Sequence, residues 1–245
     1  MTQAGNPMIR CSLLAMHMPD GYLHATTPIA GMIWLGTWGL ALGLIALCLK
    51  RVQATYDDRA VPLMGVCAAF IFAAQMINFP IPMGTSGHLL GGTLAGVLLG
   101  PWAGSLVMAV VFLVQALFFQ DGGLTVLGAN IVNMGLVGTF GGYYLYKGIR
   151  RLIGRDRWTG VMLGAAIAGW VSVVMASLFC ALQIGLSGTV DLGLVLGAML
   201  FWHGFIGLGE AVITLLALDY VRRLRPELIY KAPRDRSGVA SGEMG

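Results

Sequence analysis

Charged residues are scarce in this chain. Asp, Glu, Lys and Arg make up 11% of its 245 residues, whereas 57% are hydrophobic, and the mean hydropathy is +0.80. A soluble domain needs far more polar surface than this to cover its core. Apolar runs of about twenty residues, the length that a helix needs to cross a bilayer, recur along the whole chain. The scarcity of charge therefore excludes a soluble domain and predicts one membrane domain.

Several catalytic motifs are also missing from the sequence. There is no GxxxxGK[ST] phosphate loop, so we expect no ATP site in this chain. There is no HExxH pair, which counts against a membrane zinc protease, and no GxSxG turn to present a nucleophilic serine. Asp57 and Asp58 are adjacent, but no other two carboxylates lie close together in the sequence. These absences indicate that the chain is not an enzyme.

Cysteine pairs and basic stripes are missing as well. The four cysteines are scattered without a CxxC pair, which favours buried small apolar side chains over a disulfide or a thiolate metal site. The net charge is +4, but no basic stripe with interleaved aromatic residues is present. We therefore expect membrane lipid, and no nucleic acid, around the molecule.

Glycine is abundant, and its 36 residues lie largely inside apolar runs, where small side chains let transmembrane helices approach closely. The sequence predicts an all-α integral membrane protein of about seven transmembrane helices. The candidate spans are 27–49, 61–79, 88–100, 101–119, 124–146, 159–184 and 194–220.

Positive charge gives the orientation of these spans. Fourteen of the fifteen Lys and Arg residues fall after the first span, after the fifth span or at the C-terminal end, and the connections 80–87, 120–123 and 185–193 carry none. Basic loops stay in the cytoplasm. All three basic clusters share one side only if the short segment 88–100 crosses the membrane and Pro101 ends it. The charge pattern therefore predicts an outside N-terminus and a cytoplasmic C-terminus.

Two histidines lie where this topology places the outer surface. His17 stands in MHMPDGYL before the first span, and His88 stands in GTSGHLLGG at the start of the short span. If the chain begins at Met16, its α-amine, the next amide nitrogen and Nδ1 of His17 form two fused chelate rings. The His88 imidazole would complete a planar set of nitrogen ligands that suits Ni(II) and Cu(II). On spacing alone, the alternative that both are ordinary interfacial residues stays open.

Several long segments resemble one family, in the same order along the chain. They are MHMPDGYL, PLMGVCAAFIFAAQMINFPIPMGTSGHLLGGTLAGVLLGPWA, QDGGLTVLGANIVNMG and WHGFIGLGEAVIT. Together they resemble the CbiM/NikM family, whose members are the substrate-specific components of energy-coupling factor (ECF) transporters for cobalt and nickel. The resemblance runs from Met16 to about Leu228.

The resemblance implies a function and a set of ligands. It implies uptake of Co²⁺ or Ni²⁺, as the transported substrate, across the cytoplasmic membrane of a prokaryote. Metal binding by the amino-terminal Met-His pair carries over onto Met16 and His17, and the histidine of the TSGHLLGG motif carries over onto His88. The implied partners are a transmembrane coupling (T) subunit, cytoplasmic ATPase (A) subunits and a small accessory membrane subunit. The motifs do not separate cobalt from nickel.

The first fifteen residues depart from the family pattern, because a main-chain amine at Met16 is not free while residues 1–15 remain attached. We expect 1–15 to reflect a misplaced start codon or to be removed by processing, with translation from Met1, Met8 or Met16 all open. The metal-binding domain is expected over 16–225, and a polar cytoplasmic tail over 226–245.

Other polar residues are candidates for supporting roles. Asp20, Ser86, Asn130 and Asn133 are candidate neighbours of the metal ligands; an Asn amide that hydrogen-bonds an imidazole would orient it, although tying helices together is the alternative. His203 and Glu210 lie inside the last span, where polar groups normally face the bundle interior. Two alternatives remain open: an ECF component for an organic vitamin, and a membrane enzyme that uses His203 and Glu210 as an acid/base pair.

Overall fold

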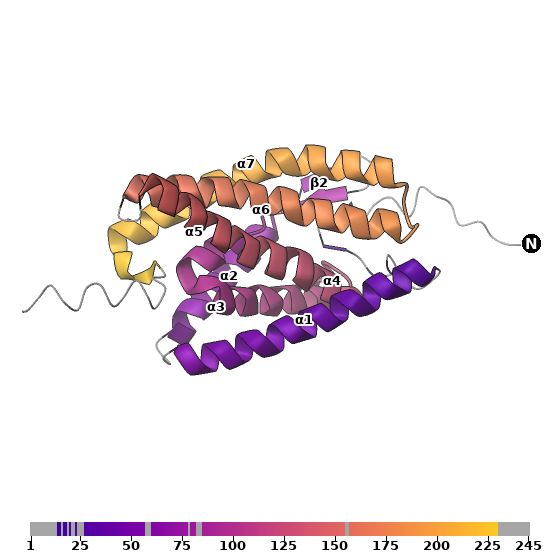
Figure 1. Ribbon diagram of the computed structural model, residues 1–245, viewed down its shortest axis with the longest axis horizontal. Coiled ribbons are helices and arrows are strands. Elements are labelled where there is room, and N and C mark those ends of the chain that lie inside the picture. The colour runs from indigo at the N-terminus through magenta and orange to yellow at the C-terminus, as the bar shows by residue number, and fades with distance from the viewer. Residues whose placement is uncertain are drawn as a thin grey trace, which may run out of the picture.

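The computed structural model is nearly all-helical (Figure 1). It describes residues 14–15, 17–18, 20, 23, 27–56, 60–77, 79–81, 85–154 and 157–229. The helices are α1 (Pro28–Thr55), α2 (Ala60–Gln75), α3 (Gly92–Val114), α4 (Leu127–Asn130), α5 (Gly142–Ile153), α6 (Trp158–Leu186) and α7 (Leu192–Leu224). Gln115–Phe119 and Ile131–Gly141 are π-helical continuations of α3 and α4, and a 3₁₀ turn covers Pro226–Leu228.

Four of these helical segments are long and apolar enough to cross a membrane, which confirms the membrane class. They are Pro28–Thr55, Gly92–Phe119, Trp158–Leu186 and Leu192–Leu224, and Val61–Gln75 is a shorter apolar helix. Large apolar side chains on the outer faces, such as Leu35 at 65% and Leu216 at 65% exposure, are positioned to contact lipid. The structure therefore has the surface of a multi-pass membrane protein.

The segment Gly92–Val114 folds back on itself at Gly100. Gly100 has φ +76° and ψ 168°, outside the helical region. A Cβ atom on Gly104 would lie 3.0 Å from the carbonyl carbon of Ala95, although nine residues of straight helix would separate them by roughly 13 Å. The break expected at Pro101 between 88–100 and 101–119 is therefore present, but the first helix begins at Gly92 and residues 88–91 are a loop.

Contacts at the two ends of this hairpin give the direction of each half. The Tyr56 hydroxyl, just after α1, donates to the carbonyl oxygen of Leu99 at the turn. At the opposite end, Gln115 donates to Gln75 at 2.9 Å, and Gln75 donates to the carbonyl oxygen of Leu90 at 2.6 Å. Residues 92–99 therefore run away from the His88 loop, and 101–115 run back toward it.

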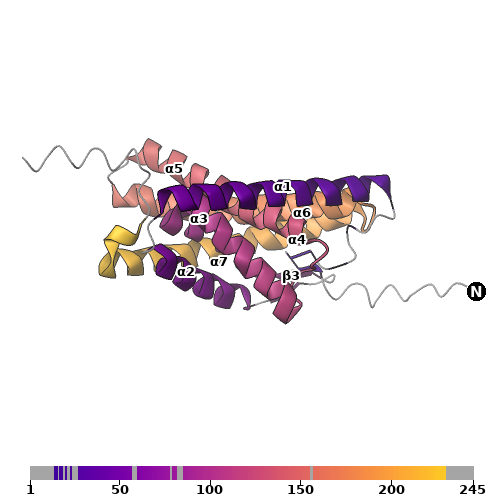
Figure 2. The same cartoon turned by 90° about the horizontal axis from the view of Figure 1, so that it is seen from below.

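A small sheet corrects the all-α prediction. Strands β1 (Leu14–Ala15), β2 (Phe79–Ile81) and β3 (Thr85–Gly87) form a sheet of order β1-β3-β2, in which β1 is parallel and β2 antiparallel to β3. Strands of two or three residues are too short to show an alternating pattern, so they could not be predicted from the sequence. The sheet lies toward the end of the bundle where α1 begins (Figure 2).

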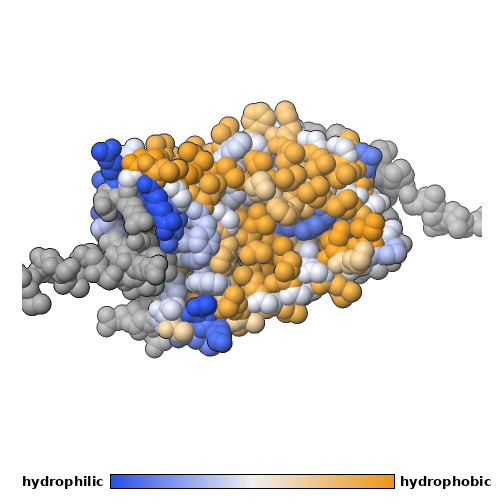
Figure 3. Space-filling view, in the orientation of Figure 1, coloured by the Kyte–Doolittle hydropathy of each residue, from blue (hydrophilic) through white to orange (hydrophobic). Residues whose placement is uncertain are grey.

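Basic residues gather at the other end of the bundle. The Arg51 guanidinium lies 5.6 Å from the Trp102 ring centroid, and that of Arg222 lies 4.5 Å from Trp158. The last turn of α5 carries Arg150 and Arg151 at the same end. Much of the strongly hydrophilic surface in Figure 3 lies at this end, beyond a broad apolar band.

Candidate metal centre

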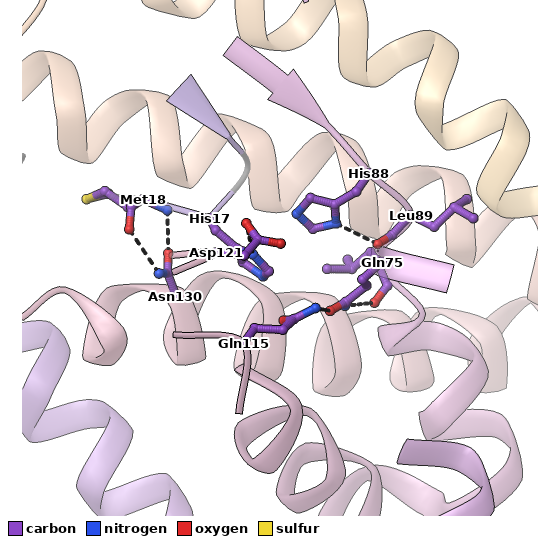
Figure 4. A network of polar contacts seen from close by, with 9 residues as sticks. His17, Met18, Gln75, His88, Leu89, Gln115, Asp121 and Asn130 are labelled. Carbon is purple, nitrogen blue, oxygen red and sulfur yellow. Dashed lines mark hydrogen bonds and ion pairs between the residues drawn. The ribbon is translucent and has the colours of Figure 1, made fainter. Parts of the chain in front are cut away.

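His17 and His88 lie side by side, just beyond the ends of two short parallel strands. Leu14 pairs with Thr85 and Ala15 pairs with Ser86. The same offset, continued past the strand ends, brings His17 opposite His88. Their ring centroids are 4.4 Å apart, and both residues are buried, at 1% and 0% exposure (Figure 4). The structure thus brings together the two histidines that the sequence selected.

His88 is oriented with one free nitrogen. Its Nδ1 lies 2.7 Å from the carbonyl oxygen of Leu89, an acceptor that fixes the proton on Nδ1. Its Nε2 is buried and has no hydrogen-bond partner within the part of the chain that the structure describes. Burial, followed by the neighbouring His17 imidazole, lowers the pKa of His88 to about 3. His88 is therefore neutral at physiological pH, with the Nε2 lone pair available to a ligand.

His17 faces a carboxylate that the sequence did not identify. Its Nδ1 lies 3.1 Å from Oδ1 of Asp121, and the Phe112 ring packs edge-on against the imidazole at a centroid distance of 5.3 Å. Burial alone would raise the pKa of Asp121, but the contact with His17 lowers it below its ordinary value. Asp121 is thus an anion in the site. Its signal in the sequence was an acidic residue in the connection 120–123, which carries no Lys or Arg.

The segment that carries His17 is held by the loop before α4 and by α4 itself. Asn130 accepts from the Met18 amide at 2.7 Å and donates to the Met18 carbonyl oxygen at 3.2 Å. The amide of Gly123 donates to the same carbonyl oxygen at 2.9 Å. Asp20 accepts from the Thr125 amide at 2.8 Å and from its hydroxyl at 2.6 Å. Asn130 therefore positions the main chain beside His17, and it does not bond the imidazole.

Other sequence candidates lie away from the two imidazoles or cannot be described. Asn133 and Gln183 exchange two hydrogen bonds, at 2.9 and 2.8 Å, and tie the π-helical stretch to α6. Met16 lies outside the described residues. Ser86 is part of β3, but its side chain is not described.

Glu210 and His203 face different partners on the buried side of α7. Both oxygens of Glu210 accept from main-chain amides, those of Leu90 at 2.9 Å and Gly91 at 2.8 Å. Nδ1 of His203 lies 2.8 Å from the Met199 carbonyl oxygen. Glu210 is therefore engaged with the His88 loop, and the two side chains do not form the acid/base pair that the enzyme alternative requires. The contact also places the loop beside the middle of α7.

Side chains alone do not complete a metal site in the described structure. Over those residues, no group of three or more His, Cys, Asp or Glu side chains could hold a metal ion. The donors on hand are two imidazoles, one carboxylate and nearby main-chain atoms.

Comparison with known protein families shows to which family the chain belongs. Residues 17–228 match the family model described as the cobalt uptake substrate-specific transmembrane region, CbiM. The chain belongs to the CbiM family. This match spans the His17 segment, the His88 loop and all seven labelled helices.

Relatives of this CbiM-family chain are named as metal transport proteins. It is 34% identical over 220 residues to the cobalt transport protein CbiM of Sorangium cellulosum, covering 87% of this chain and 94% of that protein. It is 43% identical over 216 residues to an Archaeoglobus fulgidus protein whose name describes a fused nickel transport protein NikMN, covering 87% and 68%.

A solved structure shares the fold of this CbiM-family chain. The crystal structure of a truncated transition metal transporter matches with a TM-score of 0.76 and 33% identity, covering 84% of this chain and 98% of the other. Family membership and apolar helices together make the chain a multi-pass protein of the prokaryotic cytoplasmic membrane, among transporters of cobalt and nickel.

Proposed function

We propose that the chain captures Co²⁺ or Ni²⁺ from the outer side of the membrane and holds it between His17 and His88. The observation that supports this most directly is the pair of buried imidazoles 4.4 Å apart, with Nε2 of His88 unpartnered among the described residues. Buried polar atoms without partners are costly, and they are retained where a ligand completes them. A divalent ion that accepts nitrogen lone pairs fits that role.

The proposed ligand set includes two main-chain nitrogens. With Met16 as the first residue, its α-amine, the deprotonated amide and Nδ1 of His17, and Nε2 of His88 surround the ion in one plane. Planar nitrogen ligation favours nickel over cobalt on chemical grounds. Residues 1–15 would then be absent from the working protein. The pairing of Leu14–Ala15 with β3 would be lost with them. The hydrogen bond between the Met18 amide and Asn130 would still hold the new terminus in place.

Asp121 has a place in this proposal beside the His17 ligand. Its Oδ1 faces Nδ1 of His17, the same atom that the chelate needs. In this proposal an ion held at Nδ1 of His17 would lie next to the Asp121 carboxylate. The carboxylate then stays beside the cation, where opposite charge in a buried site attracts it more strongly than in water. Asp121 thus favours entry of the ion without being one of the planar ligands.

We propose that transport needs partner subunits, because the sequence contains no GxxxxGK[ST] phosphate loop. We propose that the chain crosses the membrane seven times with its N-terminus outside. The reversal of the chain at Gly100 supports the number of crossings, and the basic clusters support the side on which the N-terminus lies. A coupling T subunit, ATPase A subunits and a small accessory membrane subunit would then drive release to the cytoplasm. A tightly chelated ion does not leave unaided at a useful rate.

Metal titration of the purified chain tests the ligand set. We predict stoichiometric binding of Ni(II) or Co(II) by the wild type, and losses of at least about 100-fold in affinity for His17→Ala and for His88→Ala, since each removes a direct ligand. His24→Ala, at a histidine with no assigned role, is the matched control and should bind as the wild type does. Full binding by both His17→Ala and His88→Ala would exclude the site.

A further inference from the structure

The loop that carries His88 is hydrogen-bonded to a carboxyl group of α7. Gly91 has φ +73°, a left-handed conformation that suits glycine. The amides of Leu90 and Gly91 donate to Oε2 and Oε1 of Glu210, at 2.9 and 2.8 Å. Glu210 is itself 2% exposed. A buried carboxyl group with both oxygens on one loop holds that loop strongly.

One peptide group connects the hydrogen bonds of Glu210 to the His88 ring. The amide of Leu90 and the carbonyl of Leu89 belong to the same planar peptide unit, so fixing one fixes the other. The amide donates to Glu210, and the carbonyl oxygen lies 2.7 Å from Nδ1 of His88. The orientation of the ring, and the nitrogen that it leaves free, therefore depend on Glu210 through a single rigid plane.

The opposite side of the loop is held by α2. Gln75 donates to the Leu90 carbonyl oxygen at 2.6 Å, and Gln115 donates to Gln75 at 2.9 Å. A Cβ atom on Gly91 would lie 3.0 Å from two carbon atoms of Ile71, so the turn packs closely against this helix. With α2 on one side, the Glu210 carboxyl group is the contact from α7 that keeps the loop in place.

We infer that Glu210 is a positioning residue for metal binding: it orients the Leu89–Leu90 peptide, which in turn presents Nε2 of His88 to the ion beside His17. This inference rests on the proposed function, in which His88 is a ligand of the ion. The carboxyl group that accepts both hydrogen bonds lies on α7. A shift of α7 relative to the loop would therefore change the orientation of His88 and weaken its binding of the ion.

Three variants of the full chain separate this role from simple helix packing. Glu210→Ala removes both acceptors. Glu210→Gln keeps the shape but leaves one oxygen acceptor in place of two. Thr214→Val is the matched control, one helical turn along α7, buried at 1% exposure and nearly unchanged in size. Each variant is titrated with Ni(II), and the visible absorption band of the bound ion reports its geometry.

Metal affinity should fall by about 10- to 100-fold in Glu210→Ala, and by less in Glu210→Gln, with the absorption band displaced from that of the planar complex. Thr214→Val should match the wild type. If Glu210→Ala does not fold, the isosteric Glu210→Gln decides. Wild-type affinity and an unchanged band in the folded Glu210 variant would overturn the inference.

Hydrogen exchange of the metal-free protein provides a second readout that does not depend on metal binding. The amides of Leu90 and Gly91 should exchange faster in both Glu210 variants, and at the wild-type rate in Thr214→Val. If the wild type binds no metal, the proposed function fails, and the exchange rates alone decide whether Glu210 holds the loop. Unchanged exchange at Leu90 and Gly91 would overturn the inference, and so would faster exchange with unaltered metal affinity.

Discussion

At the scale of single residues, the main feature of the candidate metal centre is its two buried imidazoles, those of His17 and His88. Nε2 of His17 and Nε2 of His88 are buried without hydrogen-bond partners in the described part of the chain. Leaving such groups unsatisfied costs about 1–3 kcal/mol each. The Leu89 carbonyl oxygen accounts for Nδ1 of His88 and leaves its Nε2 for an ion, whereas on His17 the proposed chelate uses Nδ1, the nitrogen that faces Asp121.

Metal affinity should depend steeply on pH, with His88 contributing little to the slope. The pKa of His88 is lowered to about 3, so this imidazole is already neutral above about pH 5 and the ion displaces no proton from it. The α-amine, with an ordinary pKa of about 7.7–8.0, and the amide nitrogen must each lose a proton. Near neutral pH, affinity should therefore fall by about 100-fold for each unit of acidification. Titrations between pH 6.5 and 7.5 measure this slope, and a slope near zero would contradict main-chain ligation.

The two histidines could be selected from the sequence because the charge pattern predicted both at the outer side and each stands in a motif that resembles the CbiM/NikM family. Asp121 could not, since nothing in the sequence shows that the loop after α3 returns to the His17 segment. Asn130 was expected to touch an imidazole or to tie helices, and it grips the Met18 main chain instead. Residue types can be read from a sequence, whereas long-range pairings of this kind cannot.

At the scale of elements, the turn at Gly100 decides how α3 is arranged. The combination of φ +76° and ψ 168° is nearly restricted to glycine. Glycine followed by proline marked the break in the sequence, and the structure turns the chain there. The short strands and the π-helical stretches had no comparable signal, because they are either too short for periodicity or hydrophobic on every side.

Substitution at this turn should destabilise the protein. Gly100→Ala forces a side chain into a strained backbone conformation, at a cost of about 1–3 kcal/mol. Gly39→Ala is the matched control, because Gly39 lies within α1 with nothing within 4 Å of its would-be Cβ. We expect a lowered midpoint of thermal unfolding for Gly100→Ala only. Equal midpoints for the two variants would show that Gly100 is not under conformational constraint.

At the scale of the whole molecule, the distribution of charge predicts the orientation in the membrane. The ring contacts of Arg51 and Arg222, and the basic last turn of α5, lie at one end of the bundle. The site residues lie toward the other end. This separation agrees with the grouping of basic residues in the sequence, and basic loops remain cytoplasmic.

Labelling from outside the cell tests this orientation. Leu152, at the basic end, and Leu192, at the start of α7, are both exposed leucines. In a chain whose four native cysteines are replaced by alanine, a membrane-impermeant thiol reagent should label Leu192→Cys in intact cells and Leu152→Cys only after permeabilisation. The reverse pattern would place the N-terminus in the cytoplasm.

The most direct test of the metal centre is native mass spectrometry of the chain purified from its own membrane. A polypeptide that begins at Met16 and carries one nickel or cobalt ion, lost in His88→Ala, is the predicted result. A mature chain that keeps residues 1–15 and still carries the ion with full affinity would contradict ligation by the amine of Met16.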